Sequence, residues 1–217
     1  MPNKTIKPNK TIKIRKRTPH LRHTSKNKFT FNETEYKSND GMLTTIWGPS
    51  MWHYLHTMSF NYPIEPTAED KRHYKNFIYN LQYVLPCGKC RKNLKKNLKE
   101  YPLQNKHMLS RDSFSRYVYG LHEQINKMLH KTSGLSYEDV RERYEHFRAR
   151  CATSYDKMKE EINKLHKNKD KNTTKENGCT IPLYGEKSKC VLHIVPQAHK
   201  CETLQIDDKC IKKRIDI

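Results

Sequence analysis

Two cysteines near the middle of the chain have the spacing of a redox-active dithiol. Cys87 and Cys90 stand at the start of a segment with helical spacing, Pro86-Cys87-Gly88-Lys89-Cys90. Such a pair closes to a disulfide with little backbone movement, and the unpaired N–H groups of a first helical turn favour the thiolate. Pro86 suits the first helical position, because its missing N–H costs nothing there. The pattern predicts thiol–disulfide exchange, with metal binding and inert burial as the alternatives.

Residues suited to a flat redox cofactor lie on both sides of this pair. A Trp-Gly-x-x-x-Trp-x-x-x-His run comes before it, and a His-x-x-x-Asn pair followed by a lysine comes after it. Residues four apart share one helix face. Aromatic planes, ring nitrogens and an amide facing a dithiol match what such a cofactor needs, although the same spacing also suits a plain core. The residues are Trp47, Gly48, Trp52, His56, His122, Asn126 and Lys131.

Apolar residues at helical spacing predict the elements that hold these side chains. Four helices and a short fifth, joined by brief connections, favour an all-α helix bundle. The expected segments are about 44–62, 67–85, 86–101, 112–131 and 136–147. The expected N-terminal caps are Thr44 or Thr45, Thr67 together with Asp70, Asp112 or Ser113, and Ser136.

Charge and composition divide the 217 residues into four parts. The net charge is +20 and only 34% of residues are hydrophobic, so we expect one core of about a hundred residues. Residues 1–42 are a basic arm expected to be disordered, because one-signed charge and few apolar groups do not offset chain entropy. Residues 43–152 are the bundle, and 153–178 a charged helix or linker. Residues 179–217 are a cysteine-containing tail of mixed or β character, with short strands expected at 180–184 and 191–195.

Cysteine use and hydropathy bear on the compartment. No secretory signal is visible at the N-terminus, and no stretch approaches the roughly 20 apolar residues of a membrane span. We therefore expect a soluble protein made in the cytosol, where a Cys-x-x-Cys is more often catalytic or metal-binding than structural. The seven cysteines are an odd number, so at least one thiol is free or pairs outside the chain.

The ordered set of motifs resembles the Erv/ALR family of FAD-linked sulfhydryl oxidases. The resemblance covers about residues 45–151 and rests on Trp47 to Trp52, Leu55-His56-Thr57, Tyr62-Pro63, Pro86 to Cys90, and His122 to Asn126. It implies a four-helix bundle that grips FAD, with a fifth helix beside it. The Lys/Asn/Ile-rich sequence is more similar to the oxidases of large cytoplasmic DNA viruses, which implies disulfide formation for virion proteins in the host cytoplasm or the virion.

The same resemblance implies the role of each site residue. Cys87 would exchange with the substrate, and Cys90 would lie next to the flavin. Electrons would pass from two thiols through this pair to FAD and then to oxygen, giving a disulfide and hydrogen peroxide. The substrates would be protein thiols or a thioredoxin-like carrier, and family members commonly dimerise through the first helices. The implied FAD contacts are Trp47, Gly48, Trp52, His56, Tyr62, His122, Asn126, Lys131 and Tyr144.

The chain departs from the family at Glu123, which stands where asparagine is usual, and at Tyr144, which replaces tryptophan. The family's second, shuttle cysteine pair has no closely spaced counterpart. Cys179, Cys190, Cys201 and Cys210 are candidates for a wider-spaced shuttle or for structural disulfides, and Cys151 is expected to be a lone thiol.

Two other functions stay open at this point. One is a zinc-binding interaction protein: Cys190, His193, His199 and Cys201 have short-range ligand spacing. We predict no metal at the dithiol itself, because it lacks a second compact ligand pair. The other is nucleic-acid binding through the basic arm, which is compatible with an oxidase.

Overall fold

The computed structural model describes residues 33–150, 179, 181–196, 198–201 and 204–211. Most of the expected basic arm, Cys151 and the charged segment 153–178 lie outside the described residues. Residues up to Asn39 are a unit of their own, in which α1 (Glu33–Tyr36) is a single turn with a Lys37–Glu33 ion pair of 3.1 Å. None of the described helices combines the length and the apolar character that crossing a membrane requires.

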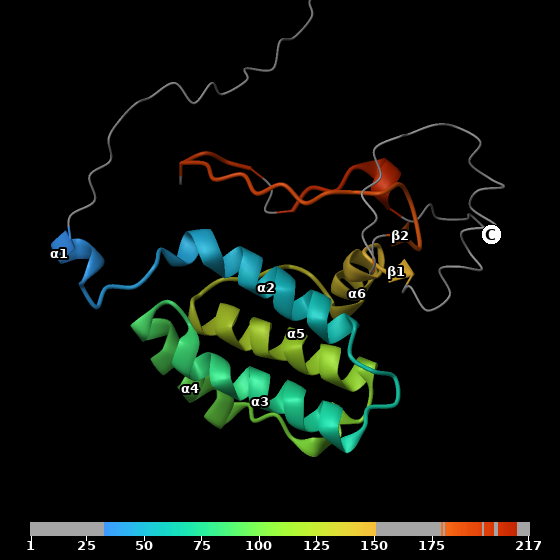
Figure 1. Cartoon of the computed structure of the whole chain (residues 1–217), viewed down its shortest axis with the longest axis horizontal. Coiled ribbons are helices and arrows are strands. Elements are labelled where there is room, and N and C mark those ends of the chain that lie inside the picture. Colours follow the sequence, from blue (N-terminus) through green and yellow to red (C-terminus); the bar gives the residue numbers. More distant parts are fainter. Residues whose placement is uncertain (1–32, 151–178, 180, 197, 202–203, 212–217) are drawn as a thin grey trace, which may run out of the picture. The chain divides into compact units, whose positions relative to one another are not determined.

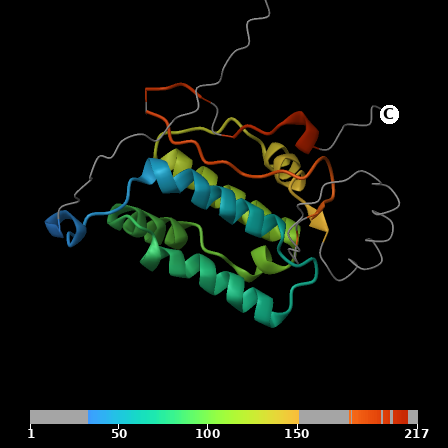
Figure 2. The same cartoon turned by 45° about the horizontal axis from the view of Figure 1, so that its top comes forward.

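Five longer helices build the second unit, so the predicted all-α core is confirmed. The helix α2 packs along α5 and against α6, whereas α3 packs along α4, and α4 also contacts α5 (Figures 1 and 2). A 3-10 turn, η1 (Asn105–Met108), precedes α5 and packs on it. The bounds are α2 Thr44–Phe60, α3 Ala68–Val84, α4 Gly88–Glu100, α5 Arg111–Met128 and α6 Tyr137–Glu145.

The main core gathers apolar side chains from α2, α3, α4 and α5. Its largest members are aromatic, and their burial is the dominant favourable contribution to folding. A smaller cluster of Phe60, Tyr137 and Val140 joins α2 to α6. The main core consists of Leu55, Tyr62, Ile78, Leu81, Leu94, Leu98, Leu103, Met108, Phe114, Tyr117, Val118 and Leu121.

Two of the predicted helix caps are confirmed. The Thr67 hydroxyl accepts the Asp70 N–H at 3.1 Å, and the Asp70 carboxylate accepts the Thr67 N–H at 2.9 Å. Ser136 and Asp139 form the same reciprocal pair at the start of α6, with distances of 3.2 and 2.8 Å. These bonds satisfy N–H groups that a helix start leaves unpaired.

Two other expected caps are wrong. The helix α5 is capped by Ser110, and Ser113 serves as its partner by accepting the Ser110 N–H at 3.0 Å. Asp112 instead pairs with Arg116 one turn later, at 2.9 Å. At α2 the cap position is Leu43, which gives no side-chain hydrogen bond, and the threonine at 44 is already helical.

The tail contains less strand than expected. The strand β2 (Ile181–Pro182) pairs antiparallel with β1 (Ala149–Arg150), and Leu183 N–H extends the contact to the Arg148 carbonyl at 2.7 Å. Residues 191–195 form no strand, so this expectation is wrong: among the described residues, their backbone is part of no strand ladder. A turn at Gly185 and the short η3 (Asp208–Cys210) complete the described tail.

Candidate active site

The dithiol lies at the first turn of α4, as a disulfide between Cys87 and Cys90 with a Cα–Cα distance of 5.1 Å. Cys87 is the cap residue, and its Sγ accepts the Cys90 N–H at 3.2 Å. Pro86 therefore precedes the cap, and the expectation that it opens the helix is wrong. Cys87 takes the cap position because its sulfur accepts the Cys90 N–H, as a polar cap side chain normally does.

Both cysteines are half-buried, so the disulfide is within reach of solvent. The Arg91 guanidinium lies over the same turn: it donates to the Leu85 carbonyl at 2.5 Å and stands 3.6 Å from where a Cβ on Gly88 would be. A cation and free helix N–H groups beside a thiol favour the thiolate, which is the attacking species in disulfide exchange. The arrangement is that of an accessible exchange site.

A stack of aromatic and imidazole rings forms where α2, α5 and α6 meet. Trp52 and His122 lie face to face, with centroids 3.7 Å apart and an interplanar angle of 7°. His56 Nε2 and His122 Nδ1 share a hydrogen bond of 3.0 Å. The Tyr144 ring stacks on His56 with centroids 5.2 Å apart. The structure thus brings together four residues that the sequence assigned to one site, and we call them the ring cluster.

The two histidines of the ring cluster are neutral. Burial, and then the neighbouring His122, lowers the pKa of His56 to about 3. Burial also lowers the pKa of His122 to about 4. One proton therefore bridges the two rings, and the buried Nδ1 of His56 is left without a hydrogen-bond partner in the described structure. An unpaired buried nitrogen is costly unless a ligand pairs with it.

Three further rings extend the cluster and were missed from the sequence. Phe60 stacks on Tyr144 with centroids 5.6 Å apart. His53 lies 5.5 Å from Tyr144 and 5.6 Å from Phe147, centroid to centroid. The spacing offered a signal: His53 is three residues before His56 and Phe60 is four after it, so all three share a helix face.

Asn126 and Lys131 lie together at the end of α5. The Asn126 amide donates to the Glu123 carboxylate at 3.0 Å, and the Asn126 carbonyl accepts the Lys131 N–H at 2.9 Å. His130 takes a positive φ of 54°, which ends the helix and turns the chain back. The Lys131 side chain is exposed and is available to an anionic group.

The other predicted cofactor residues are placed differently. Tyr62 is 0% exposed, and its hydroxyl donates to the Met108 carbonyl at 3.1 Å, so it belongs to the main core. The Trp47 indole N–H donates a hydrogen bond to the Met42 carbonyl at 3.0 Å. Gly48 faces open space, because a Cβ added there would meet no atom within 4 Å.

Residues 49–145 match the Erv1/Alr family. This stretch is an Erv1/Alr family domain. It includes the disulfide, the whole ring cluster and Asn126, so the predicted family is confirmed on the segment that contains the candidate chemistry.

Curated relatives of the Erv1/Alr domain come from viruses and from cells. The chain is 40% identical over 80 residues to a probable FAD-linked sulfhydryl oxidase of Acanthamoeba polyphaga mimivirus, covering 37% of this chain and 56% of the relative. It is 32% identical over 84 residues to the mitochondrial FAD-linked sulfhydryl oxidase ERV1 of Saccharomyces cerevisiae, covering 39% and 43%. The chain thus spans about half the length of these relatives.

The solved structures similar to the Erv1/Alr domain include the yeast Erv1 core. That crystal structure is 25% identical, with a TM-score of 0.43, and the match covers 58% of this chain and 96% of that one.

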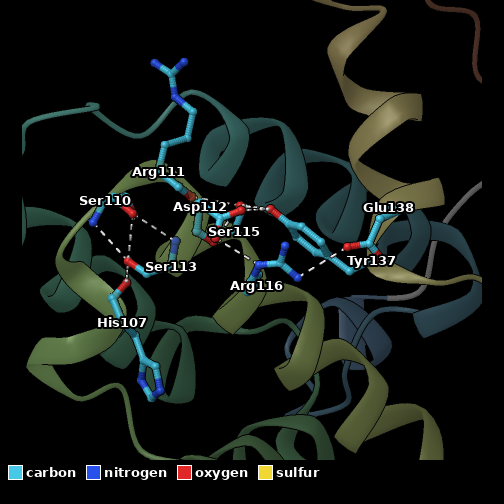
Figure 3. Close-up of polar contacts among 9 residues, drawn as sticks. All are labelled: His107, Ser110, Arg111, Asp112, Ser113, Ser115, Arg116, Tyr137 and Glu138. Atoms are coloured by element: carbon cyan, nitrogen blue, oxygen red, sulfur yellow. Dashed lines mark hydrogen bonds and ion pairs between the residues drawn. The ribbon is translucent and has the colours of Figure 1, made fainter.

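A pocket of about 300 Å³ opens in the Erv1/Alr domain on another side of Phe60. Figure 3 shows polar contacts among several of its lining residues and their neighbours: the Ser115 and Tyr137 hydroxyls lie 2.7 Å apart, and Tyr137 reaches Asp112 at 3.3 Å. Arg116 joins Asp112 to Glu138 at 2.9 and 3.5 Å. These polar groups pair with one another, and we assign them to joining α5 and α6. The lining residues are Phe60, Arg111, Asp112, Ser115, Tyr137, Arg141, Glu145 and Arg148.

Three tail cysteines after the Erv1/Alr domain form neither the expected structural disulfides nor the expected zinc set in the described residues. Cys190 and Cys201 are exposed thiols and Cys210 is a half-buried thiol, so no structural disulfide joins these three. Within the described ranges, no group of three or more His, Cys, Asp or Glu side chains is placed to hold a metal. The zinc set centred on Cys190 and Cys201 is therefore not assembled.

Proposed function

We propose that the chain is an FAD-linked sulfhydryl oxidase, which converts pairs of thiols into disulfides. The observation that carries this proposal is the combination, in one Erv1/Alr domain, of a solvent-accessible disulfide at a helix start with a stacked ring cluster. The names of the relatives, viral and cellular, support the same activity and the same cofactor.

The ring cluster fits FAD on chemical grounds. The unpaired Nδ1 of His56 offers a hydrogen bond to a polar ring edge, and Trp52 and Tyr144 offer aromatic faces. The open surface at Gly48 leaves room for close approach, and the Lys131 ammonium suits a phosphate. When bound, FAD supplies the two-electron acceptor that protein side chains lack.

The chain's own residues carry out the thiol–disulfide exchange with the substrate. A substrate thiolate attacks the Cys87–Cys90 disulfide, and a second substrate thiol completes the exchange. The substrate loses two electrons and two protons and gains an S–S bond, while the protein's S–S bond breaks. The assignment of Cys87 to substrate and Cys90 to the flavin follows the order in the family, and both sulfurs lie at the accessible turn. The neutral His56–His122 pair keeps net charge away from the proposed flavin pocket.

The proposed electron path ends at oxygen, which is reduced to hydrogen peroxide. The proposed substrates are protein thiols or a thioredoxin-like carrier, and similarity to a mimivirus relative favours virion proteins in the host cytoplasm or the virion. A homodimer and a shuttle through Cys179, Cys190, Cys201 or Cys210 belong to the same proposal. Replacing these four tail cysteines by serine then spares oxidation of dithiothreitol and slows oxidation of protein thiols.

An absorption spectrum and an oxygen electrode test the activity. Purified protein should be yellow and release flavin on denaturation, and it should consume oxygen with dithiothreitol. Cys87→Ser and Cys90→Ser should each abolish that uptake, whereas Cys201→Ser, which removes an exposed thiol, should keep it. A colourless protein with stoichiometric zinc, or full activity in both dithiol variants, would contradict the proposal.

A further inference from the structure

The segment just before α2 lies against the dithiol. Met42 N–H donates to the Pro86 carbonyl at 2.7 Å. A Cβ added at Gly41 would stand 2.8 Å from the Pro86 oxygen and 3.1 Å from Cys87 Cα, which are both backbone atoms. Only glycine permits this approach without displacing one of the two segments. We call Gly41 and Met42 the strap.

Trp47 holds the strap from its other side. Its indole N–H, on the first turn of α2, donates to the Met42 carbonyl at 3.0 Å. The backbone of Met42 is therefore bonded at both ends, to Pro86 through its N–H and to Trp47 through its carbonyl. The Met42 side chain plays no part in this, since it is 69% exposed.

We propose that the strap, with Trp47 as its positioning residue, keeps Cys87 in register with Cys90 whenever their disulfide is open. The proposal rests on the proposed function, in which every turnover breaks and re-forms this bond. Cys87 precedes the helix: its carbonyl accepts the Arg91 N–H at 3.0 Å, and its own N–H donates to the Leu85 carbonyl at 2.8 Å, so the position of its Cα also depends on the segment before α4. The strap lies beside this Cα, since a Cβ added at Gly41 would stand 3.1 Å from it.

Keeping two thiols side by side raises their effective concentration and favours the disulfide over the dithiol. If the strap is displaced, the reduced pair gains freedom that the closed pair lacks, and the equilibrium moves toward the dithiol. The strap thus acts on the redox equilibrium of the pair. Contact with the flavin, which the resemblance implied for Trp47, is not needed for this role.

The test is the anaerobic equilibrium of the Cys87–Cys90 pair of the full chain in glutathione buffers, read by thiol alkylation and mass spectrometry. Trp47→Phe keeps an aromatic ring and removes the indole N–H. It should shift the equilibrium toward the dithiol by about threefold to tenfold, the range of one lost hydrogen bond. Tenfold corresponds to about 30 mV. Gly41→Val should shift it at least as far, because its side chain meets backbone atoms.

Leu43→Ala is the matched control, since this neighbouring side chain is 66% exposed, and it should leave the equilibrium unchanged. Wild-type equilibria in both Trp47→Phe and Gly41→Val would overturn the strap proposal, and so would an equal shift in Leu43→Ala. The alkylation readout does not depend on oxygen uptake. Failure of the oxidase activity in the wild type would therefore be seen separately from failure of the strap.

Discussion

His56 is the side chain on which the proposed cofactor pocket depends most. It is 4% exposed, it bridges Trp52, His122 and Tyr144, and it carries the unpaired Nδ1. Tyr62, six residues later, was implied as a flavin contact by the same resemblance, and its side chain lies in the main core. The two positions therefore make a contrast that single substitutions can test.

The first prediction concerns flavin content. His56→Phe keeps a ring in place but removes both nitrogens, so purified protein should carry much less FAD by absorbance. Tyr62→Phe removes only the hydroxyl that donates to Met108, so it should keep its FAD and lose about 1 kcal/mol of unfolding free energy. Equal flavin loss in both variants would contradict the distinction between pocket and core.

The second prediction concerns pH. The pKa values of His56 and His122 in the folded chain, about 3 and about 4, lie below the ordinary 6.5. Below pH 6.5 the unfolded chain therefore binds more protons than the folded one, so this contribution to stability is complete above that pH and is lost as pH falls toward 4.

Urea unfolding across that range measures the slope of stability against pH. His56→Asn should flatten the slope. His73→Asn should leave it as in the wild type, because the His73 side chain is 59% exposed. A wild-type slope in His56→Asn would show that the buried pair does not control the acid response.

At the scale of elements, α6 links helix capping to the ring cluster. Ser136 and Asp139 fix the start of this helix, and Tyr144 near its end stacks on His56. A helix of nine residues has little stability of its own, so its cap matters for the position of Tyr144.

The third prediction compares two caps of the same kind. Ser136→Ala and Thr67→Ala should each cost about 1 kcal/mol in chemical unfolding. Only Ser136→Ala should also weaken FAD binding, measured by flavin fluorescence, because α3 contributes no side chain to the ring cluster. A matching loss of flavin affinity in Thr67→Ala would assign the effect to global stability instead.

Local signals in the sequence predicted the elements well, and tertiary geometry explains where they failed. Thr67 and Asp70 are one pair at capping-box spacing without adjacent competitors, so the sequence could predict this cap. Ser110, Asp112 and Ser113 offered three adjacent candidates, and the choice depends on which hydroxyl closes back on the chain. Residues 191–195 are of types that favour a strand, but a strand also needs a second backbone segment to which it can hydrogen-bond.

The candidate site shows the same limit. The helical period put Trp52 and His56 on one face, and the structure confirms that they lie together. The helical period alone could not distinguish these two residues from Trp47 or Tyr62. The difference lies in the neighbouring segment that each side chain contacts. The strap at Gly41 left no pattern at all, since its partner Pro86 is distant in sequence.

At the scale of the whole molecule, the strap follows soon after the first unit in the sequence, because that unit ends at Asn39. The fourth prediction compares two truncations. Removing residues 1–39 should leave the redox equilibrium of the Cys87–Cys90 pair unchanged. Removing residues 1–43 should shift it toward the dithiol, because Gly41 and Met42 are then gone. Glutathione titration of both truncations checks this, and a shift already present in the shorter deletion would contradict it.

The fifth prediction concerns the basic N-terminal residues. If they bind nucleic acid through phosphate contacts, a gel shift should be strong at low salt and weaken steeply as salt rises. The 1–39 truncation should lose most of the shift and keep oxygen uptake with dithiothreitol. Undiminished nucleic-acid binding in the truncation would assign that binding to another part of the chain.

The helix packing separates the two halves of the proposed reaction. The disulfide sits on α4, which packs along α3, whereas the ring cluster is built by α2, α5 and α6. A molecule that loosens between these groups keeps its exchangeable disulfide but parts it from the electron acceptor. Damage by heat or age should therefore stop oxygen consumption before it stops thiol exchange. The dithiol would then still exchange with thiols after it has lost its connection to the electron acceptor.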